Sequence, residues 1–115
     1  MAISSAQSVV VLPDYTTINV VRSTSGDGTA VLAAPGVATD YYVIDLLQLE
    51  NLSANVVSCV VKSGTRTLWS YRAPANEGLL IDKELVCGKG EPIYLNLDVT
   101  GSDVRIQALV YIITG

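Results

Sequence analysis

The segments Ile93-Tyr94-Leu95-Asn96-Leu97-Asp98-Val99 and Val104-Arg105-Ile106-Gln107-Ala108-Leu109-Val110-Tyr111-Ile112-Ile113 decide the fold class. In the first, apolar residues at every second position alternate with Tyr94, Asn96 and Asp98. A period of two is that of a strand with one buried and one solvated face. The residues between the segments, Thr100-Gly101-Ser102-Asp103, have turn chemistry. We therefore predict that the two segments form a β-hairpin.

The second segment changes character along its length. One of its sides is apolar from Val104 to Ile112, whereas the other begins with Arg105 and Gln107 and then becomes apolar. A strand of an antiparallel sheet that is buried on one face only keeps a polar second face, so we expect this second face to contact another subunit. Together with one residue of an earlier strand, the predicted contact residues are Tyr41, Leu109, Tyr111 and Ile113.

The rest of the chain also reads as short strands separated by turns. Strands are expected at 18–21, 41–50, 56–62, 67–72, 79–81 and 85–87, with a short strand or extended piece at 30–34. Neither side of 41–50 is cleanly polar, which predicts either a bulge near Asp45 or burial on both sides. Turn signals every eight to twelve residues and the lack of any helical periodicity predict an all-β sandwich or barrel. We expect one domain over residues 1–115, in which residues 1–8 form an N-terminal arm.

Charge is scarce. The 115-residue chain carries a net charge of −4 and only 16% charged residues, and its seven Lys and Arg residues are never adjacent. Nucleic-acid binding requires clustered cations, so no nucleic-acid partner is expected. A charge-poor small protein is either a neutral, Ser/Thr-coated monomer or a subunit that hides part of its surface in an oligomer or shell, and we favour the second. No apolar run reaches the length of a membrane span, and the start lacks signal-peptide features, so we expect synthesis and retention in the cytosol unless the chain is exported or released within an assembly.

The inventory of reactive side chains is small. The sequence contains no histidine, which removes histidine-based acid–base catalysis and Ser-His nucleophiles. Two cysteines without histidine do not complete a zinc site, and the valines beside Cys59 and Cys87 favour buried free thiols over a disulfide. The carboxylate pairs Asp82/Glu84 and Asp98/Asp103 fall in turns or on outward positions. We expect no catalytic residues, no cofactor and no metal site.

Two further features have both a functional and a structural interpretation. Trp69 and Tyr71 lie on one side of a strand, where they either stack on a sugar ligand or, as aromatic residues more often do, pack in the core. Asn51-Leu52-Ser53 is a glycosylation sequon that matters only in a secreted chain.

The order of strands and turns after residue 40 carries a family likeness. A Tyr/Val-rich strand ends in Asn51-Leu52-Ser53-Ala54, and a Val-alternating strand and Thr67-Leu68-Trp69 follow. The pattern continues through the loop at 74–78, Leu79-Leu80-Ile81 and Gly90-Glu91-Pro92, and closes with the two segments quoted first. This pattern resembles the small jelly-roll virion proteins of tailed bacteriophages, of the capsid decoration (cement) type. The likeness covers roughly residues 40–115 and involves no signature motif.

The resemblance implies a jelly-roll sandwich that assembles as a homotrimer on the virion surface. Its partner would be the major capsid protein or another virion protein, and the location would be the virion, assembled in the host cytoplasm, with no catalytic residues. The alternative is a carbohydrate- or receptor-binding jelly-roll module of a phage tail or fibre, because one fold serves both roles.

Overall fold

The computed structural model describes residues 15–23, 30–100 and 103–114, and its regular elements are β-strands. In chain order these strands are β1 (Tyr15–Arg22), β2 (Tyr41–Asn51), β3 (Val57–Ser63), β4 (Arg66–Ala73), β5 (Gly78–Ile81), β6 (Leu85–Val86), β7 (Ile93–Leu97) and β8 (Val104–Ile113). Within the described residues, no helix is long and apolar enough to cross a membrane. The predicted arm at residues 1–8 lies outside the described residues.

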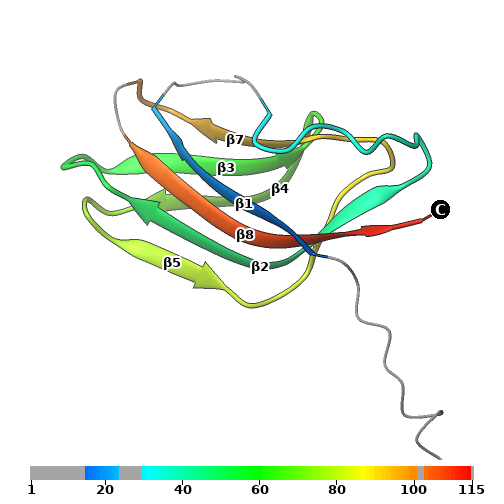
Figure 1. Cartoon of the computed structure of the whole chain (residues 1–115). Helices are drawn as coiled ribbons and strands as arrows, with labels where there is room; N and C mark the ends of the chain where they lie inside the picture. Colours follow the sequence, from blue (N-terminus) through cyan, green and yellow to red (C-terminus); the bar gives the residue numbers. More distant parts are fainter. Residues whose placement is uncertain (1–14, 24–29, 101–102, 115) are drawn as a thin grey trace, which may run out of the picture.

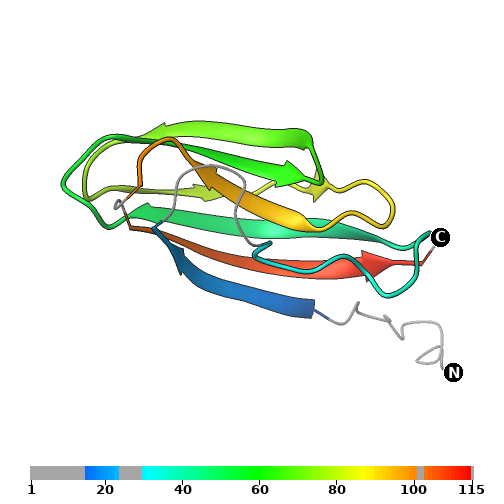
Figure 2. The same cartoon turned by 90° about the horizontal axis from the view of Figure 1, so that it is seen from above.

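Two antiparallel sheets pack face to face. The larger sheet has the order β1-β8-β2-β5, with β6 also paired to β2, and the smaller has the order β4-β3-β7. Figure 1 shows β1, β8, β2 and β5 side by side, and Figure 2 shows the two sheets as separate layers. The predicted extended piece at 30–34 contributes a single bridge, Leu32 to Ile93, at the free edge of β7. With this piece as a residual strand, and with β5 and β6 as one interrupted strand, the order is that of an eight-stranded jelly roll, as the resemblance implied.

The longest strand, β2, contains an irregularity that decides which of its side chains face the core. In β2, Ile44, Leu47 and Leu49 are almost fully buried, although a strict period of two would place Ile44 and Leu47 on opposite faces. The register against β8 shifts between Ile44 and Leu46, so the residue inserted there is Asp45. This bulge returns the apolar side chains to the inner face and confirms the predicted irregularity.

The core fills the space between the two layers. The larger sheet contributes the inward side chains of β2 and β8, and the smaller sheet contributes Val57, Cys59 and Val61 of β3 and Ile93 and Leu95 of β7. Each fully buried aliphatic side chain of this kind stabilises the fold by about 1.5–3 kcal/mol relative to an exposed one. For β7 and β8, the alternation of apolar residues therefore specified the buried side correctly.

The predicted hairpin between β7 and β8 is wrong. β7 pairs with β3 in the smaller sheet, whereas β8 lies between β1 and β2 in the larger sheet. Both strands still bury their apolar sides, and the two sides face each other across the core instead of lying next to each other in one sheet. Alternation determines which face of a strand is buried, but it contains no information about which strand supplies the hydrogen bonds.

Asn51 joins the two sheets at one end of the sandwich. It is 1% exposed, and its Nδ2 donates to the carbonyl oxygens of Asn55, Ala73 and Pro74 at 2.6, 3.2 and 3.1 Å. Its Oδ1 accepts from the backbone N–H and the hydroxyl of Ser53 at 3.0 and 2.7 Å. The nitrogen that glycosylation would modify is therefore buried and hydrogen-bonded, so the sequon here is a structural turn.

Candidate functional site

The candidate site is the outer face of the larger sheet. We define this outer face as the side chains that point away from the smaller sheet. In β8 the inward residues from Val104 to Val110 are buried, and the residues on the outer face are half-buried. Strand register extends the face across β1, β2, β5 and β6. Its apolar members are Tyr15, Val21, Tyr41, Val43, Leu46, Leu80, Val86, Leu109, Tyr111 and Ile113. Its polar members are Thr17, Asn19, Asp45, Gln48, Glu50, Arg105 and Gln107.

The structure brings all four predicted contact residues onto this outer face. Tyr41 is the direct cross-strand partner of Ile113, and Leu109 and Tyr111 occupy the next outward positions of β8. All four side chains are half-buried. Their role as an oligomer contact stays a prediction, because the structure contains a single chain.

Sequence reasoning missed six apolar members of this face, which are Tyr15, Val21, Val43, Leu46, Leu80 and Val86. Leu46 is shifted to the outer face by the bulge, and Leu80 and Val86 lie on strands too short to show a period. Leu80 is 57% exposed and Val86 is 50% exposed. The available signal was the apolar content of residues 79–81 and 85–87, which does not reveal the direction in which each side chain points.

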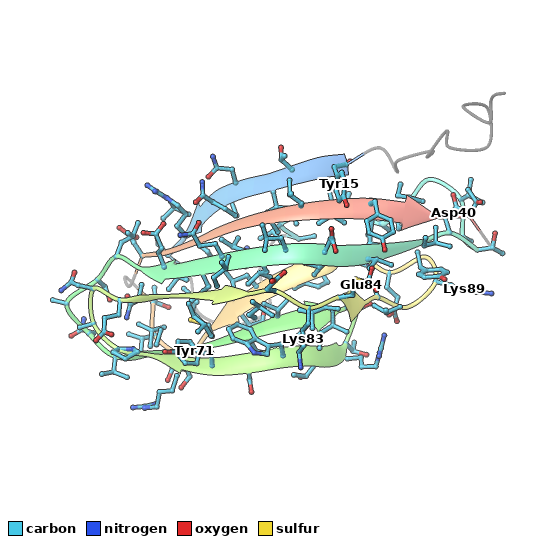
Figure 3. All side chains as sticks on the ribbon, turned by 90° about the horizontal axis from the view of Figure 1, so that it is seen from below. Tyr15, Asp40, Tyr71, Lys83, Glu84 and Lys89 are labelled. Carbon is cyan, nitrogen blue, oxygen red and sulfur yellow. The ribbon has the colours of Figure 1, made fainter. Side chains whose placement is uncertain are left out.

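Two tyrosines and two carboxylates form a cluster at one end of the outer face. The Tyr15 hydroxyl donates to Asp45 Oδ2 at 2.8 Å, and the Tyr111 hydroxyl donates to Glu84 Oε2 at 2.5 Å. The two rings meet edge to face, with centroids 5.7 Å apart. Figure 3 shows Tyr15 and Glu84 toward the same end of the larger sheet, away from Tyr71 in the other layer.

This tyrosine–carboxylate cluster shifts the titration of its hydroxyl groups. The hydrogen bond to Glu84 raises the pKa of Tyr111 to about 12, and the hydrogen bond to Asp45 raises the pKa of Tyr15. In each case a carboxylate acceptor stabilises the protonated phenol, and nearby negative charge opposes the phenolate. At neutral pH the cluster therefore consists of two neutral phenols that donate hydrogen bonds to two carboxylates.

A shallow hollow of about 370 Å³ lies in the middle of the outer face. Asn19, Gln107 and Gln48 form one continuous cross-strand row along it. The neighbouring row contains Leu109 and Leu46, and Leu80 closes one side; the further lining residues are Thr17, Ile18 and Ala108. Primary amides both donate and accept hydrogen bonds, so this row is suited to a neutral polar surface.

Charge on this part of the outer face is nearly balanced. Arg105 Nη1 lies 3.7 Å from Glu50 Oε1, and the two side chains are 41% and 34% exposed. The two residues are direct cross-strand partners in β8 and β2. Such an exposed pair adds little to stability, and both charges remain accessible to a partner.

Trp69 and Tyr71 lie in the smaller sheet, on the side that faces the core. They are the cross-strand partners of the buried residues Val61 and Cys59. Their rings stack on each other with centroids 5.7 Å apart and an interplanar angle of 20°, and both pack against the core. This position gives both rings a packing role, and their function as a sugar platform stays a prediction.

The two cysteines are free and buried, as the sequence predicted. Burial raises the pKa of each thiol to about 11. Since the thiolate is the nucleophilic form, both thiols are held in their unreactive state at neutral pH.

Three of the four carboxylates singled out in the sequence, all but Asp82, have hydrogen-bond partners in the structure. Asp98 accepts the backbone N–H of Ser58 at 2.9 Å, Asp103 accepts the Ser23 hydroxyl, and Glu84 belongs to the tyrosine–carboxylate cluster. Within residues 15–23, 30–100 and 103–114, no group of three or more carboxylate, cysteine or histidine side chains is placed to hold a metal ion. These three carboxylates thus connect strands and loops.

Comparisons of the sequence with models of known protein families and with curated proteins found no match.

Proposed function

We propose that this chain is a non-enzymatic structural protein of a bacteriophage virion, a capsid decoration protein that self-associates through the outer face of the larger sheet. The observation that carries the proposal is the composition of that face, where half-buried and exposed apolar side chains lie around a hollow in a chain with only 16% charged residues. Large exposed apolar patches on soluble proteins mark interaction surfaces. The jelly-roll strand order supports the resemblance on which the virion assignment depends.

On the strength of the resemblance, we further propose three subunits and a location on the virion after assembly in the host cytoplasm. The proposed docking partner is the major capsid protein or another virion protein. Nucleic acid and membrane are not among the proposed partners. A structural role requires no reactive group, and the protonated thiols and strand-linking carboxylates agree with it. Cryo-electron microscopy of the assembly to which the chain belongs tests this placement directly, and density for the chain away from a virion would contradict it.

Self-association is tested by Leu109→Asp, with light scattering and native mass spectrometry at micromolar concentration. Leu109 is half-buried on the outer face beside its partner Leu46, so a carboxylate there would be desolvated in an interface but still partly hydrated in the monomer. We expect the variant to be monomeric and folded. The matched control is Val60→Asp, a half-buried position on the outer face of the smaller sheet, which should leave the oligomer intact. A monomeric wild-type protein, or an oligomer that survives Leu109→Asp, would refute the proposal.

The second candidate, a carbohydrate- or receptor-binding module of a tail or fibre, is favoured by one observation. The amide row of Asn19, Gln107 and Gln48 lines an open hollow of about 370 Å³ and offers donors and acceptors to a hydroxyl-rich ligand. Glycan-array binding that Gln107→Ala abolishes, in a protein that remains monomeric, would favour this function over the first.

A further inference from the structure

We infer that two copies of this chain pair through the outer face of the larger sheet, about a two-fold axis that runs parallel to the strands between β2 and β8. This inference rests on the proposed self-association, gives it one second copy as the partner in place of the three subunits that the resemblance implies, and adds the geometry of the contact. It follows from the chemistry of successive cross-strand pairs on that face.

The outward pairs of β2 and β8 share one property: each joins two residues of the same kind or of opposite charge. The pairs are Glu50 with Arg105, Gln48 with Gln107, Leu46 with Leu109, Val43 with Tyr111, and Tyr41 with Ile113. If β2 of one copy lies over β8 of another copy, each residue of a pair therefore faces a residue of the same kind or of opposite charge.

A two-fold axis between the two strands performs this exchange. It places β2 of one copy over β8 of the other, so that Leu46 meets the second copy's Leu109 and Gln48 meets the second copy's Gln107. Amides both donate and accept hydrogen bonds, so the two amide rows can bond to each other, and the facing leucines exclude water from the contact. Glu50 meets the second copy's Arg105, and the same contact recurs on the other side of the axis, because a two-fold interface is isologous.

The other in-plane two-fold axis, perpendicular to the strands, gives a poorer match. With that axis at the level of Ala108, each strand faces its own copy in reverse. Glu50 then faces the second copy's Val43, Arg105 faces the second copy's Tyr111, and the amide row faces the leucine row. Burying charges and amides against apolar side chains opposes association, so the chemistry of the face favours the axis parallel to the strands.

The flanking strands and the size of the face agree with this pairing. The parallel axis places β5 over β1 of the second copy, where Leu80, 57% exposed, reaches the wall of the hollow that Thr17 and Asn19 form. Four strands of this length present a projected face of about 600 Å². Side-chain relief increases that area toward the roughly 800 Å² per partner of a stable interface.

The test uses native mass spectrometry of the full chain and two charge reversals. Arg105→Glu alone brings the new carboxylate of one copy against the second copy's Glu50, and Glu50→Arg alone brings two guanidinium groups together in the same way. We expect each variant alone to dissociate at least about ten-fold more readily than the wild type. A mixture of the two variants should form a heterodimer with about wild-type affinity, because both of its cross-copy contacts join a carboxylate of the Arg105→Glu copy to a guanidinium group of the Glu50→Arg copy.

The double variant Glu50→Arg/Arg105→Glu provides a second rescue. In this charge swap each new guanidinium group meets the new carboxylate of the second copy, so both cross-copy contacts again join opposite charges. We expect the double variant to dimerise with about wild-type affinity, although each of its substitutions alone weakens the dimer.

The control is Arg72→Glu, the same charge reversal at an exposed position of β4 in the smaller sheet, which should not change the dimer. Thermal unfolding verifies that each variant is folded. A wild-type dimer that the single reversals weaken, and that both the mixture and the double variant restore, supports the inference. A trimeric wild type, as the resemblance implies, or a dimer that the mixture does not restore would overturn the two-fold pairing while leaving self-association through this face intact. A monomeric wild type would overturn both.

Discussion

The two outer faces of the sandwich follow the same antiparallel alternation, yet they differ in chemistry. The outer face of the smaller sheet carries mainly hydroxyl, amide and charged side chains, with Val60 and Tyr94 as its large apolar members. The outer face of the larger sheet carries the larger apolar set, arranged around a hollow. Because both inner faces are buried in one core, the core does not require this difference. The difference agrees with the proposal that the outer face of the larger sheet is covered by another subunit.

The largest expected effect is on the stability of the whole sandwich, so it does not distinguish the two outer faces. Asn51 connects the end of β2 with the loops that lead into β3 and out of β4, and Asn51→Ala leaves three carbonyl groups without their donor. We expect the free energy of unfolding to fall by about 2–4 kcal/mol. Chemical denaturation measures it, and a loss below about 1 kcal/mol would show that water replaces the amide. At a protein concentration at which the variant is folded, its oligomeric state should match the wild type.

The next effect separates the two faces. Leu80→Asp changes an exposed side chain of the larger sheet, so it should weaken self-association about ten-fold or more while leaving the unfolding free energy of the monomer within about 0.5 kcal/mol. Tyr94→Asp is the matched change on the outer face of the smaller sheet and should leave association unchanged. Sedimentation equilibrium measures the self-association of each variant, and chemical denaturation measures its free energy of unfolding. Equal effects from the two variants would remove the distinction between the faces.

The smallest effect concerns pH and the tyrosine–carboxylate cluster. The pKa of Tyr111 is raised to about 12 in the folded chain from an ordinary value of 10.0, so the contribution of its hydrogen bond to Glu84 is complete below pH 10 and is lost as the pH rises toward 12. Wild type should therefore be more stable than Tyr111→Phe at pH 8, and the difference should shrink between pH 10 and 12. Denaturant unfolding across this range measures it, and Tyr71→Phe in the smaller sheet is the control. A constant difference would show that the hydroxyl contributes nothing specific.

Much of the candidate site was predictable because its clearest signal is local. Leu109, Tyr111 and Ile113 alternate with residues of the opposite face in one strand, so a period of two alone places them on a common face. Leu46 was not predictable in the same way, because its direction depends on the position of the bulge at Asp45. The amide row and the tyrosine–carboxylate cluster join residues from three or more segments, and only strand register brings those together.

The amino-acid sequence by itself determined the all-β class, the approximate positions of the strands, and the buried sides of β7 and β8. These properties follow from side-chain alternation and turn chemistry over a few residues. The tertiary structure alone decided that β7 and β8 lie in different sheets and that β8 lies between β1 and β2. The physical reason is that alternation fixes a strand's buried face, whereas its hydrogen-bonding partner depends on how all strands together close one core. The paired chemistry of β2 and β8, from which the two-fold contact is inferred, appears only once that partner is known.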